Sequence, residues 1–241
     1  MDATALLVPI AEAPGRSALV FDVDGTLAPI VERPELARVP EATRAELRRL
    51  AARYALVACI SGRPGAEAAT LVAVDGVRYV GNHGLELDPL AAEHARAIAR
   101  FRREVDGAWP VEDKGLSLSF HYREAANEEE ALGRLRELAG RAVAAGLAPR
   151  WGRKVLEVRP AGGADKGVAV ARLLAEAGVA RALYAGDDAT DLDGFRGLGE
   201  AELEHAVLVA VRSAEAPRDL VEAADIVVEG PAGLVAILEA L

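Results

Sequence analysis

The sequence predicts an α/β protein, with a Rossmann-like parallel-sheet core and an inserted α+β cap domain. Three observations lead to this fold class. Apolar runs alternate with helical patterns in the first third of the chain, which is typical of parallel strands covered by helices. The same alternation returns after residue 167. Between these two parts, apolar and polar residues alternate along the predicted strands, as in a sheet with one solvent-exposed face.

The first core segment covers residues 1–87. Its opening residues hold a short apolar run without a basic region, and we interpret them as a frayed start or a first helix, not a signal peptide. Strands are expected where apolar residues cluster, and a helix is expected where leucines recur at helical spacing after Pro40. In chain order, we predict a strand at 18–23, a helix at 40–54, a strand at 55–61, and two short extended pieces around a glycine turn at 77–87.

The predicted cap covers residues 88–161. It contains a strand, an amphipathic helix whose N-cap is Asn127, and a second strand that stops at a proline; these lie at 116–123, 127–146 and 154–160. In "KVLEV", a period of two places Lys154 and Glu157 on opposite faces of a regular strand. Either a bulge intervenes there, or one of these two side chains works from the rim of the site.

The second core segment, residues 162–241, repeats the alternation of the first. A helix is expected to end at Gly178, and a closing helix is expected to begin at Pro231. The predicted elements in order are a helix at 168–178, strands at 182–188, 206–211 and 224–228, and a helix at 231–241.

The composition limits the classes of function. The chain has 241 residues, of which 51% are hydrophobic, so it can bury a substantial core. Its 38 acidic and 28 basic residues give a net charge of −10, which argues against general nucleic-acid binding. Its single cysteine, Cys59, excludes an intramolecular disulfide, and no apolar window reaches the ~18 residues of a membrane span. We expect a soluble cytoplasmic protein that does not bind membranes; the oligomeric state stays open, with a monomer favoured.

The stretch "ALVFDVDGT" places two carboxylates, Asp22 and Asp24, directly after a buried strand. A period of two along the strand predicts that both lie on one side. Ligands of open α/β sheets bind at the carboxyl ends of the strands, near the point where strand order reverses. The alternative is an ordinary polar turn, because Asp-Gly is a common turn pair. An EF-hand is excluded, since Gly25 comes too early in the motif.

Three further stretches supply what two such carboxylates need for phosphate chemistry. "CISGRPG" offers the Ser61 hydroxyl and the backbone N–H groups of Ser61 and Gly62 to phosphate oxygens. "GADKG" places Lys166 just before a helix, and "AGDDATD" (185–191) adds carboxylates after another strand. Each stretch alone is typical of a turn, a solvated lysine or an acidic loop. Together they provide a nucleophile, a phosphate clamp, a compensating cation and metal ligands.

These four stretches, in this order, resemble the haloacid dehalogenase-like superfamily of phosphohydrolases, of which "DVDGT" is the signature. The second aspartate resembles the phosphatase and phosphomutase members. The segments "GNHG" (81–84), "HYR" (121–123), "GRKVLEVRP" (152–160) and "GDDATD" (186–191) are similar to the trehalose-6-phosphate phosphatases, and the resemblance covers nearly the full chain. The sequence departs from that family after "GDDATD", where it reads "LDG" and the family often has further acids.

The resemblance implies a role for each motif residue. Asp22 is the expected nucleophile, and Asp24 is the expected general acid and then base. Ser61 and Lys166 are expected to hold the transferring phosphoryl oxygens. Mg²⁺ is the expected cofactor, because hard oxygen ligands suit it; its ligands would be the Asp22 carboxylate, the Asp24 backbone carbonyl and the Asp187 carboxylate. Asp188 and Asp191 are expected to support those ligands or to hold their loop.

The resemblance also implies a set of residues that contact the substrate, a small-molecule sugar phosphate. On the core side these are Gly62, Arg63, Asn82, His83 and Gly84. On the cap side they are Arg123, Lys154 and Glu157. For His83, a purely structural role is the alternative.

The expected function is Mg²⁺-dependent hydrolysis of trehalose 6-phosphate through an aspartyl-phosphate. One alternative is a phosphatase of another sugar phosphate, such as glucosyl- or mannosyl-glycerate phosphate or sucrose phosphate. A catalytically silent domain that binds a sugar phosphate or a partner synthase is a second alternative, against which the intact catalytic set argues. A phosphomutase is a weaker option still.

Overall fold

The computed structural model describes residues 3–31, 33–105, 107, 109–152, 154–214 and 216–241. The chain divides into two compact units. The core unit comprises Met1–Gly84 and Ala164–Leu241, and the cap unit comprises Leu85–Gly163. The core unit has a parallel sheet and the cap unit an antiparallel one, which confirms the predicted fold class.

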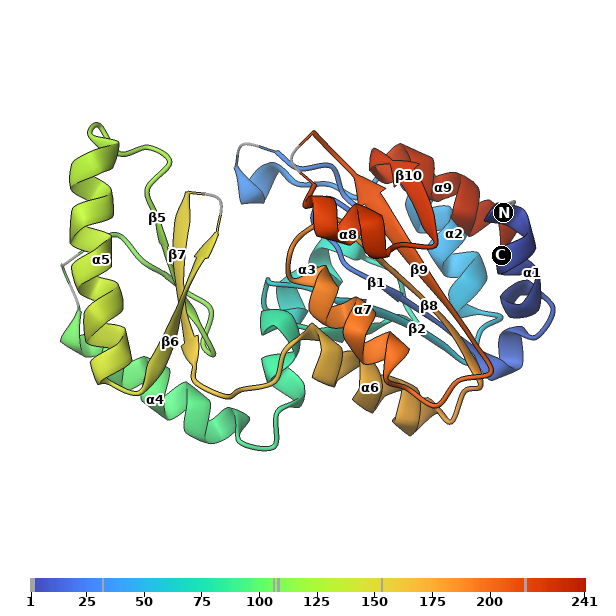
Figure 1. Ribbon diagram of the computed structural model, residues 1–241, viewed down its shortest axis with the longest axis horizontal. Helices are drawn as coiled ribbons and strands as arrows, with labels where there is room; N and C mark the ends of the chain where they lie inside the picture. Colours follow the sequence, from blue (N-terminus) through green and yellow to red (C-terminus); the bar gives the residue numbers. More distant parts are fainter. Residues whose placement is uncertain (1–2, 32, 106, 108, 153, 215) are drawn as a thin grey trace. The chain divides into compact units, whose positions relative to one another are not determined.

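A six-stranded parallel sheet forms the centre of the core unit (Figure 1). Its order is β10-β9-β8-β1-β2-β3, with β1 Ser17–Phe21, β2 Leu56–Ile60, β3 Arg78–Val80, β8 Arg181–Gly186, β9 His205–Arg212 and β10 Ile226–Glu229. The chain runs from β1 to β3 on one side of β1, then starts again at β8 on the other side. The strand order therefore reverses between β1 and β8, and this is where ligands bind in such sheets.

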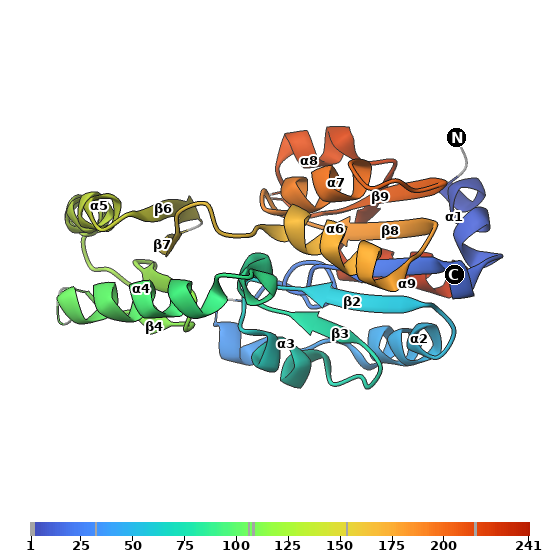
Figure 2. The same ribbon diagram turned by 90° about the horizontal axis from the view of Figure 1, so that it is seen from below.

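Helices cover both faces of this sheet. Helices α1 Ala3–Ala11, α2 Glu41–Ala51 and α9 Gly230–Ala240 pack on one face, against strand residues such as Leu19, Phe21 and Val57. On the opposite face lie α6 Lys166–Ala177 and α7 Asp191–Gly199, while α3 Gly65–Val72 and α8 Arg218–Ala223 flank β3 and β9. The parallel strands can be followed side by side from β9 to β3 in Figure 2. Burial of each large apolar side chain here contributes roughly 1.5–3 kcal/mol to the free energy of unfolding.

The cap unit has a hydrophobic core of its own. Its antiparallel sheet has the order β4-β5-β7-β6, with β4 Glu112–Asp113, β5 Leu118–His121, β6 Leu147–Gly152 and β7 Val155–Pro160. Helices α4 Ala91–Glu104 and α5 Glu128–Ala144 pack against this sheet, and Phe101 of α4 and Leu135 of α5 share one hydrophobic cluster with Leu156 of β7. Because each unit has its own sheet and its own core, the pattern of apolar and polar residues along the strands differs between the core segments and the cap.

Several predicted details are confirmed. The Asn127 side chain accepts a hydrogen bond from the Glu130 backbone N–H at 3.2 Å, as an N-cap does. Helix α6 ends at Gly178, whose left-handed φ of +61° is typical of a C-cap. Pro231 lies in the first turn of α9.

Other predicted details are wrong. Strand β1 ends at Phe21, not at residue 23. The second extended piece expected at 77–87 is a run of 3₁₀ turns, Asn82–Leu87, because Asn82 and His83 adopt positive φ angles. Helix α6 begins at Lys166, before the predicted start at 168, since the Asp165 carboxylate caps it by accepting from the Val168 N–H at 2.9 Å. The sequence patterns did not predict the elements α3, α4, α7, α8, β4 and β6.

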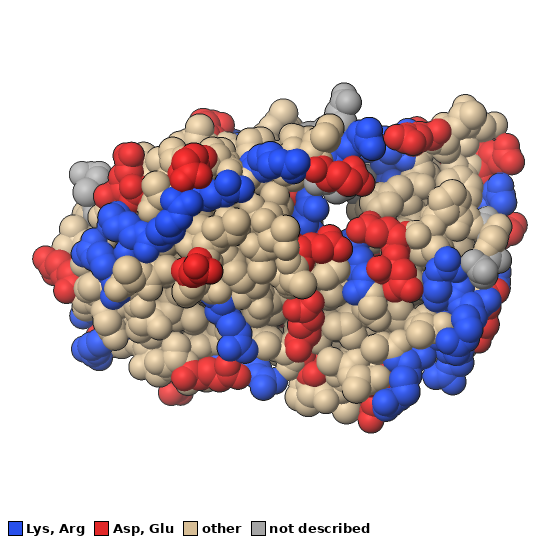
Figure 3. Space-filling view, turned by 180° about the vertical axis from the view of Figure 1, so that it is seen from behind, with Lys and Arg blue, Asp and Glu red and all other residues tan. Residues whose placement is uncertain are grey.

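The net negative charge of the protein belongs to the core unit. Residues 85–163 contain thirteen basic and thirteen acidic side chains, so the whole acidic excess lies outside that range. On the face shown in Figure 3, Lys and Arg side chains form several groups, and Asp and Glu side chains lie beside these groups. Among the described helices, none is both long and apolar enough to cross a membrane.

Candidate active site

The predicted core motifs meet at the carboxyl ends of β1, β2 and β8. Asp22 follows β1, Ser61 follows β2, and Asp187 follows β8. Backbone hydrogen bonds continue the sheet into these loops: the Asp22 N–H donates to the Ala185 carbonyl at 2.9 Å, and the Ser61 N–H to the Val80 carbonyl at 2.9 Å. The sheet therefore fixes the position of the backbone from which these side chains project.

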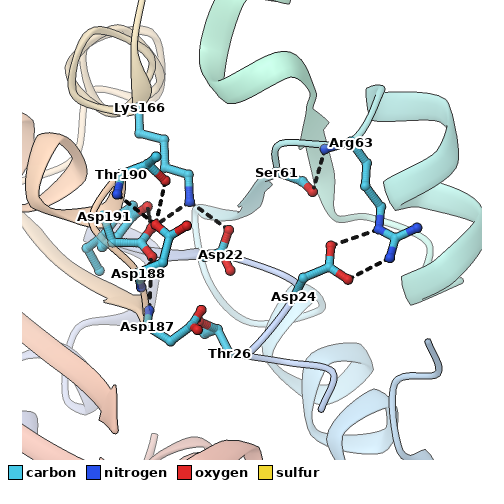
Figure 4. Close-up of polar contacts among 11 residues, drawn as sticks. Asp22, Asp24, Thr26, Ser61, Arg63, Lys166, Asp187, Asp188, Thr190 and Asp191 are labelled. Carbon is cyan, nitrogen blue, oxygen red and sulfur yellow. Dashed lines mark hydrogen bonds and ion pairs between the residues drawn. The ribbon is translucent and has the colours of Figure 1, made fainter. Parts of the chain in front are cut away.

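A buried ionic network, Asp22–Lys166–Asp191, lies at the centre of the site (Figure 4). The Lys166 ammonium donates to Asp22 Oδ1 and to Asp191 Oδ1, each at 2.7 Å, and no side chain of the three is more than 8% exposed. Burial lowers the pKa of Lys166, but the charges of Asp191 and Asp22 outweigh it, so its pKa lies well above its ordinary value. The lysine is therefore cationic, and it points at the predicted nucleophile.

Asp191 is held on both of its oxygens. Oδ1 also accepts a hydrogen bond from the Tyr184 hydroxyl at 2.7 Å, while Oδ2 accepts from the backbone N–H groups of Asp187 and Asp188 at 2.9 Å each. A carboxylate whose acceptors are filled in this way orients its neighbours. Asp191 thus contacts both the lysine and the loop that carries Asp187.

Asp22 and Asp187 form a candidate cation site. Carboxylate oxygens of Asp22, Asp187 and Asp191 lie within 4.8 Å of one another. Burial raises the pKa of Asp22 well above its usual range despite Lys166, and burial with the charges of Asp191 and Asp188 raises the pKa of Asp187 to about 7. This crowding of buried negative charge, made of hard oxygen donors, fits a divalent cation. Since Asp191 is already occupied by Lys166, Tyr184 and the backbone, Asp22 and Asp187 are the better ligands.

Gly25 makes room for this cation site. Its φ is +97°, and a Cβ at this position would lie 2.1 Å from Asp187 Oδ2. On the other side, Asp187 Oδ1 accepts a hydrogen bond from the Thr26 hydroxyl at 3.2 Å. The "DGT" sequence thus seats the Asp187 carboxylate, with the glycine avoiding a collision and the threonine supplying a donor.

Asp188 has a separate set of partners beside the cation site. Its Oδ1 accepts hydrogen bonds from the Thr190 N–H at 2.7 Å and from the Thr190 hydroxyl at 2.6 Å. Burial raises the pKa of Asp188, but Lys166 and these hydrogen bonds outweigh it, and the net shift is downward. Asp188 therefore stays ionised and holds the turn that leads into α7.

Asp24 lies apart from Asp22 and points toward Arg63 (Figure 4). Because β1 already ends at Phe21, both aspartates follow the strand, and strand periodicity does not determine the direction of their side chains. Arg63 Nε and Nη2 donate to the two Asp24 oxygens at 2.7 Å each. The Asp24 side chain is 38% exposed and that of Arg63 is 18% exposed, so this pair lies at the edge of the site.

The "GNHG" segment holds the loop after β2 through backbone hydrogen bonds. The His83 N–H donates to the Ser61 carbonyl at 2.8 Å, and the Asn82 N–H donates to the Arg63 carbonyl at 2.9 Å. Asn82 and His83 have φ angles of +52° and +54°, a strain of about 1–3 kcal/mol each. The His83 ring lies over Gly62, where a Cβ would come within 2.7 Å of it. A glycine at position 62 therefore leaves the room that the His83 ring occupies.

The three predicted cap residues lie in different local environments. Lys154 precedes β7 with a left-handed φ of +55°; it pairs with Glu128 and lies over the Tyr122 ring at 5.7 Å. Glu157, within β7, accepts a hydrogen bond from the Ser117 hydroxyl at 3.0 Å, and Arg123 is exposed after β5. Since Lys154 is outside the strand, the predicted conflict between Lys154 and Glu157 in one regular strand does not arise.

The sequence reading missed Tyr184 and Thr26. Tyr184 lies within the apolar sequence of a strand, where an aromatic residue is typical of the hydrophobic core. Thr26 belongs to the quoted "DGT" motif, and its position beside two acids was the available signal. Both residues support carboxylates of the network described above.

A family model, sequence relatives and a solved structure all relate this chain to trehalose-phosphate phosphatases. A family model described as trehalose-phosphatase matches residues 20–105 and 93–224. The chain is 37% identical to a trehalose-phosphate phosphatase of Mycolicibacterium paratuberculosis over 74% of this chain and 50% of the relative. It is 34% identical to one of Mycobacterium marinum over 90% of this chain and 59% of the relative. A solved structure of trehalose-6-phosphate phosphatase from Aspergillus fumigatus matches with a TM-score of 0.64 and 27% identity, covering 98% of this chain and 96% of that one.

The chain is shorter than the curated relatives that it matches. It spans 50% to 61% of several trehalose-phosphate phosphatases, and 15% of an uncharacterized glycosyl hydrolase of Mycobacterium tuberculosis. The likeness therefore concerns one region of longer proteins.

Proposed function

The chain belongs to the trehalose-phosphatase family, and from this membership and the site geometry we propose that it hydrolyses trehalose 6-phosphate to trehalose and phosphate. The observation that carries the proposal is the contact of the Lys166 ammonium with the buried Asp22 carboxylate at the point where strand order reverses. A buried cation beside a buried carboxylate at a ligand-binding edge provides a nucleophile together with a stabiliser of phosphoryl oxygens.

In the proposed first step, Asp22 Oδ attacks phosphorus in line with the sugar oxygen. The P–O bond to the sugar breaks, and Asp24, which must enter this step protonated on one carboxyl oxygen, gives that proton to the leaving oxygen. A carboxylate near a phosphate dianion is repelled, by about 4 kcal/mol for each pair of unit charges at ~4 Å and an effective dielectric constant of ~20. Lys166 and the Ser61 hydroxyl and N–H oppose that repulsion by binding the phosphoryl oxygens.

In the second step, Asp24 accepts a proton from a water molecule, which attacks phosphorus and releases Asp22 and inorganic phosphate. Mg²⁺ would be held by the Asp22 and Asp187 carboxylates and the Asp24 carbonyl, and it would supply charge neutralisation at the phosphoryl group. Asp191 keeps Lys166 aimed at Asp22 through both steps. We further propose that Arg123, Lys154 and Glu157 of the cap unit bind the sugar.

Phosphate release from a panel of sugar phosphates tests this function. The panel contains trehalose 6-phosphate, sucrose 6-phosphate, glucosyl- and mannosyl-glycerate phosphates and glucose 6-phosphate, each assayed with Mg²⁺. We expect the highest kcat/KM for trehalose 6-phosphate. Equal efficiency on glucose 6-phosphate contradicts this substrate and indicates a broad sugar phosphatase. Binding of sugar phosphates without any turnover supports instead a silent binding domain.

A further inference from the structure

We propose that Arg63 is a positioning residue for Asp24, keeping its carboxylate at the edge of the site and out of the cation cluster. This inference rests on the proposed function, because it concerns how Asp24 meets the leaving sugar oxygen. Sequence motifs place Arg63 among the residues that contact substrate. Its guanidinium instead meets Asp24 through two hydrogen bonds of 2.7 Å each, in the fork-to-fork arrangement that fixes a carboxylate plane (Figure 4).

The two partners come from neighbouring loops whose backbones are fixed independently. Asp24 lies in the tight loop after β1, where the Gly25 N–H donates to the Ala28 carbonyl at 2.7 Å. Arg63 lies in the loop after β2. Its backbone N–H donates a hydrogen bond to Ser61 Oγ at 3.1 Å, and its backbone carbonyl accepts one from the Asn82 N–H at 2.9 Å. These contacts of Arg63 use backbone atoms. A substitution therefore removes the guanidinium while leaving the loop bonded.

The charges of the site explain why Asp24 needs a holder. Asp22, Asp187 and Asp191 already crowd around the cation site, and Lys166 is the ammonium partner of Asp22 and Asp191. A free Asp24 side chain, which starts only two residues from Asp22, is attracted to the same lysine and to a metal ion in that site. Arg63 supplies Asp24 with a cation of its own on the opposite side. The Asp24 carboxylate is thus kept for the leaving oxygen and does not join the carboxylates of Asp22 and Asp187 as a further metal ligand.

Substrate binding and positioning make different kinetic predictions for Arg63→Met. If Arg63 positions Asp24, kcat for trehalose 6-phosphate falls about 10- to 100-fold, part of the 10²–10⁴-fold supplied by general acid catalysis, while KM changes little. If Arg63 binds the substrate, KM rises instead. Lysine keeps the charge but not the fork, so Arg63→Lys recovers only part of kcat.

A leaving group that needs no proton separates positioning from a general structural defect. The p-nitrophenolate burst from p-nitrophenyl phosphate reports attack by Asp22 alone, and we expect Arg63→Met to leave its rate unchanged. In an Asp24→Asn background, Arg63→Met should cause no further loss on trehalose 6-phosphate, because Arg63 acts through Asp24. Equal loss of the burst, or additive losses in the double variant, overturns the proposal.

Arg38→Met is the matched control. Arg38 lies in a loop of the same unit and donates to the Glu35 and Ala37 backbone carbonyls at 2.8 and 2.6 Å, and we expect its kcat to be that of the wild type. Metal titration by calorimetry gives a second readout: Arg63→Met should bind Mg²⁺ more tightly than wild type, since Asp24 is free to join the cluster. Unchanged affinity contradicts the cluster-exclusion step. Wild-type turnover of trehalose 6-phosphate, measured alongside, checks the proposed function separately.

Discussion

The two ion-paired groups of the site differ in how deeply they lie in the protein. The Asp22–Lys166–Asp191 network has no side chain more than 8% exposed, while the Asp24 and Arg63 side chains are 38% and 18% exposed. A buried charge cannot leave its partner without a large desolvation penalty, whereas a charge at the edge can exchange its partner for water. The difference teaches that burial holds the nucleophile in place, whereas Asp24 at the edge of the site depends on Arg63 for its position.

Substitution of the nucleophile gives the largest expected effect. Asp22→Asn should lower kcat for trehalose 6-phosphate about 10³-fold or more, because an amide cannot form the acyl phosphate. The melting temperature should not fall, since the variant removes one carboxylate from a crowded buried cluster. Phosphate release and differential scanning fluorimetry measure the two effects. Activity above a few per cent of wild type would show that Asp22 is not the nucleophile.

Removal of the lysine sharpens the comparison through stability. Lys166→Met leaves Asp22 and Asp191 buried without their cation and should cost about 3–5 kcal/mol at pH 8. The matched control is Arg172→Met on the same helix, whose pair with Glu176 is half exposed and should be worth less than ~1 kcal/mol. Urea unfolding of both variants measures the difference. Similar losses in the two variants would mean that burial does not separate these ion pairs.

Proton and metal binding should compete at the buried network. The pKa of Asp187 is raised from 3.8 to about 7 in the folded protein, so the folded state holds this proton more tightly than the unfolded chain. Metal-free protein should therefore lose stability as pH rises from about 4 through 7. Mg²⁺ should restore it, by about 2.7 kcal/mol at a hundredfold excess over Kd, and more at pH 8 than at pH 5.5.

Melting curves with EDTA and with Mg²⁺ at both pH values test this competition. Calcium-free buffers and a matched ionic strength keep the comparison to one ion. A stabilisation by Mg²⁺ that is the same at pH 5.5 and pH 8 would contradict proton competition at Asp187.

Substitutions in the cap unit should have the smallest and most selective effect. Glu157→Gln or Lys154→Met should lower kcat/KM for trehalose 6-phosphate roughly 5- to 150-fold, the range for one lost polar contact of about 1–3 kcal/mol. Hydrolysis of p-nitrophenyl phosphate, which offers no sugar, should be unchanged. Arg136→Gln, an exposed position on α5, is the control. Parallel losses on both esters would indicate a structural role for these residues.

The sequence indicates the core fold well because its signals are local. Apolar runs mark β1, β2 and β8, and the Asn127 cap and Gly178 end are visible in single residues. The short cap strand β4 and helix α3 carry weak patterns, and tertiary packing decides them. Backbone conformation is the second limit: the left-handed angles of Asn82 and His83 depend on contacts with the loop after β2, which is distant in sequence.

The candidate site shows the same division. Residue types at strand ends suffice to place Asp22, Ser61, Lys166 and Asp187 at one edge of the sheet. They do not reveal that Asp24 turns to Arg63, because that depends on the exact residue at which β1 ends. Nor do they reveal Tyr184, whose hydroxyl matters only because Asp191 lies beside it.

The central position of β1 also has a consequence for synthesis of the chain. Its neighbour on one side, β2, follows within forty residues, but its neighbour on the other side, β8, pairs Arg181 with Ser17 and is made only after the whole cap. Contacts this distant in sequence close late. A nascent chain that has just completed the cap therefore carries Asp22 and Ser61 without Lys166 or Asp187. Its most buried strand has one bare edge, open to pairing with another chain until β8 arrives.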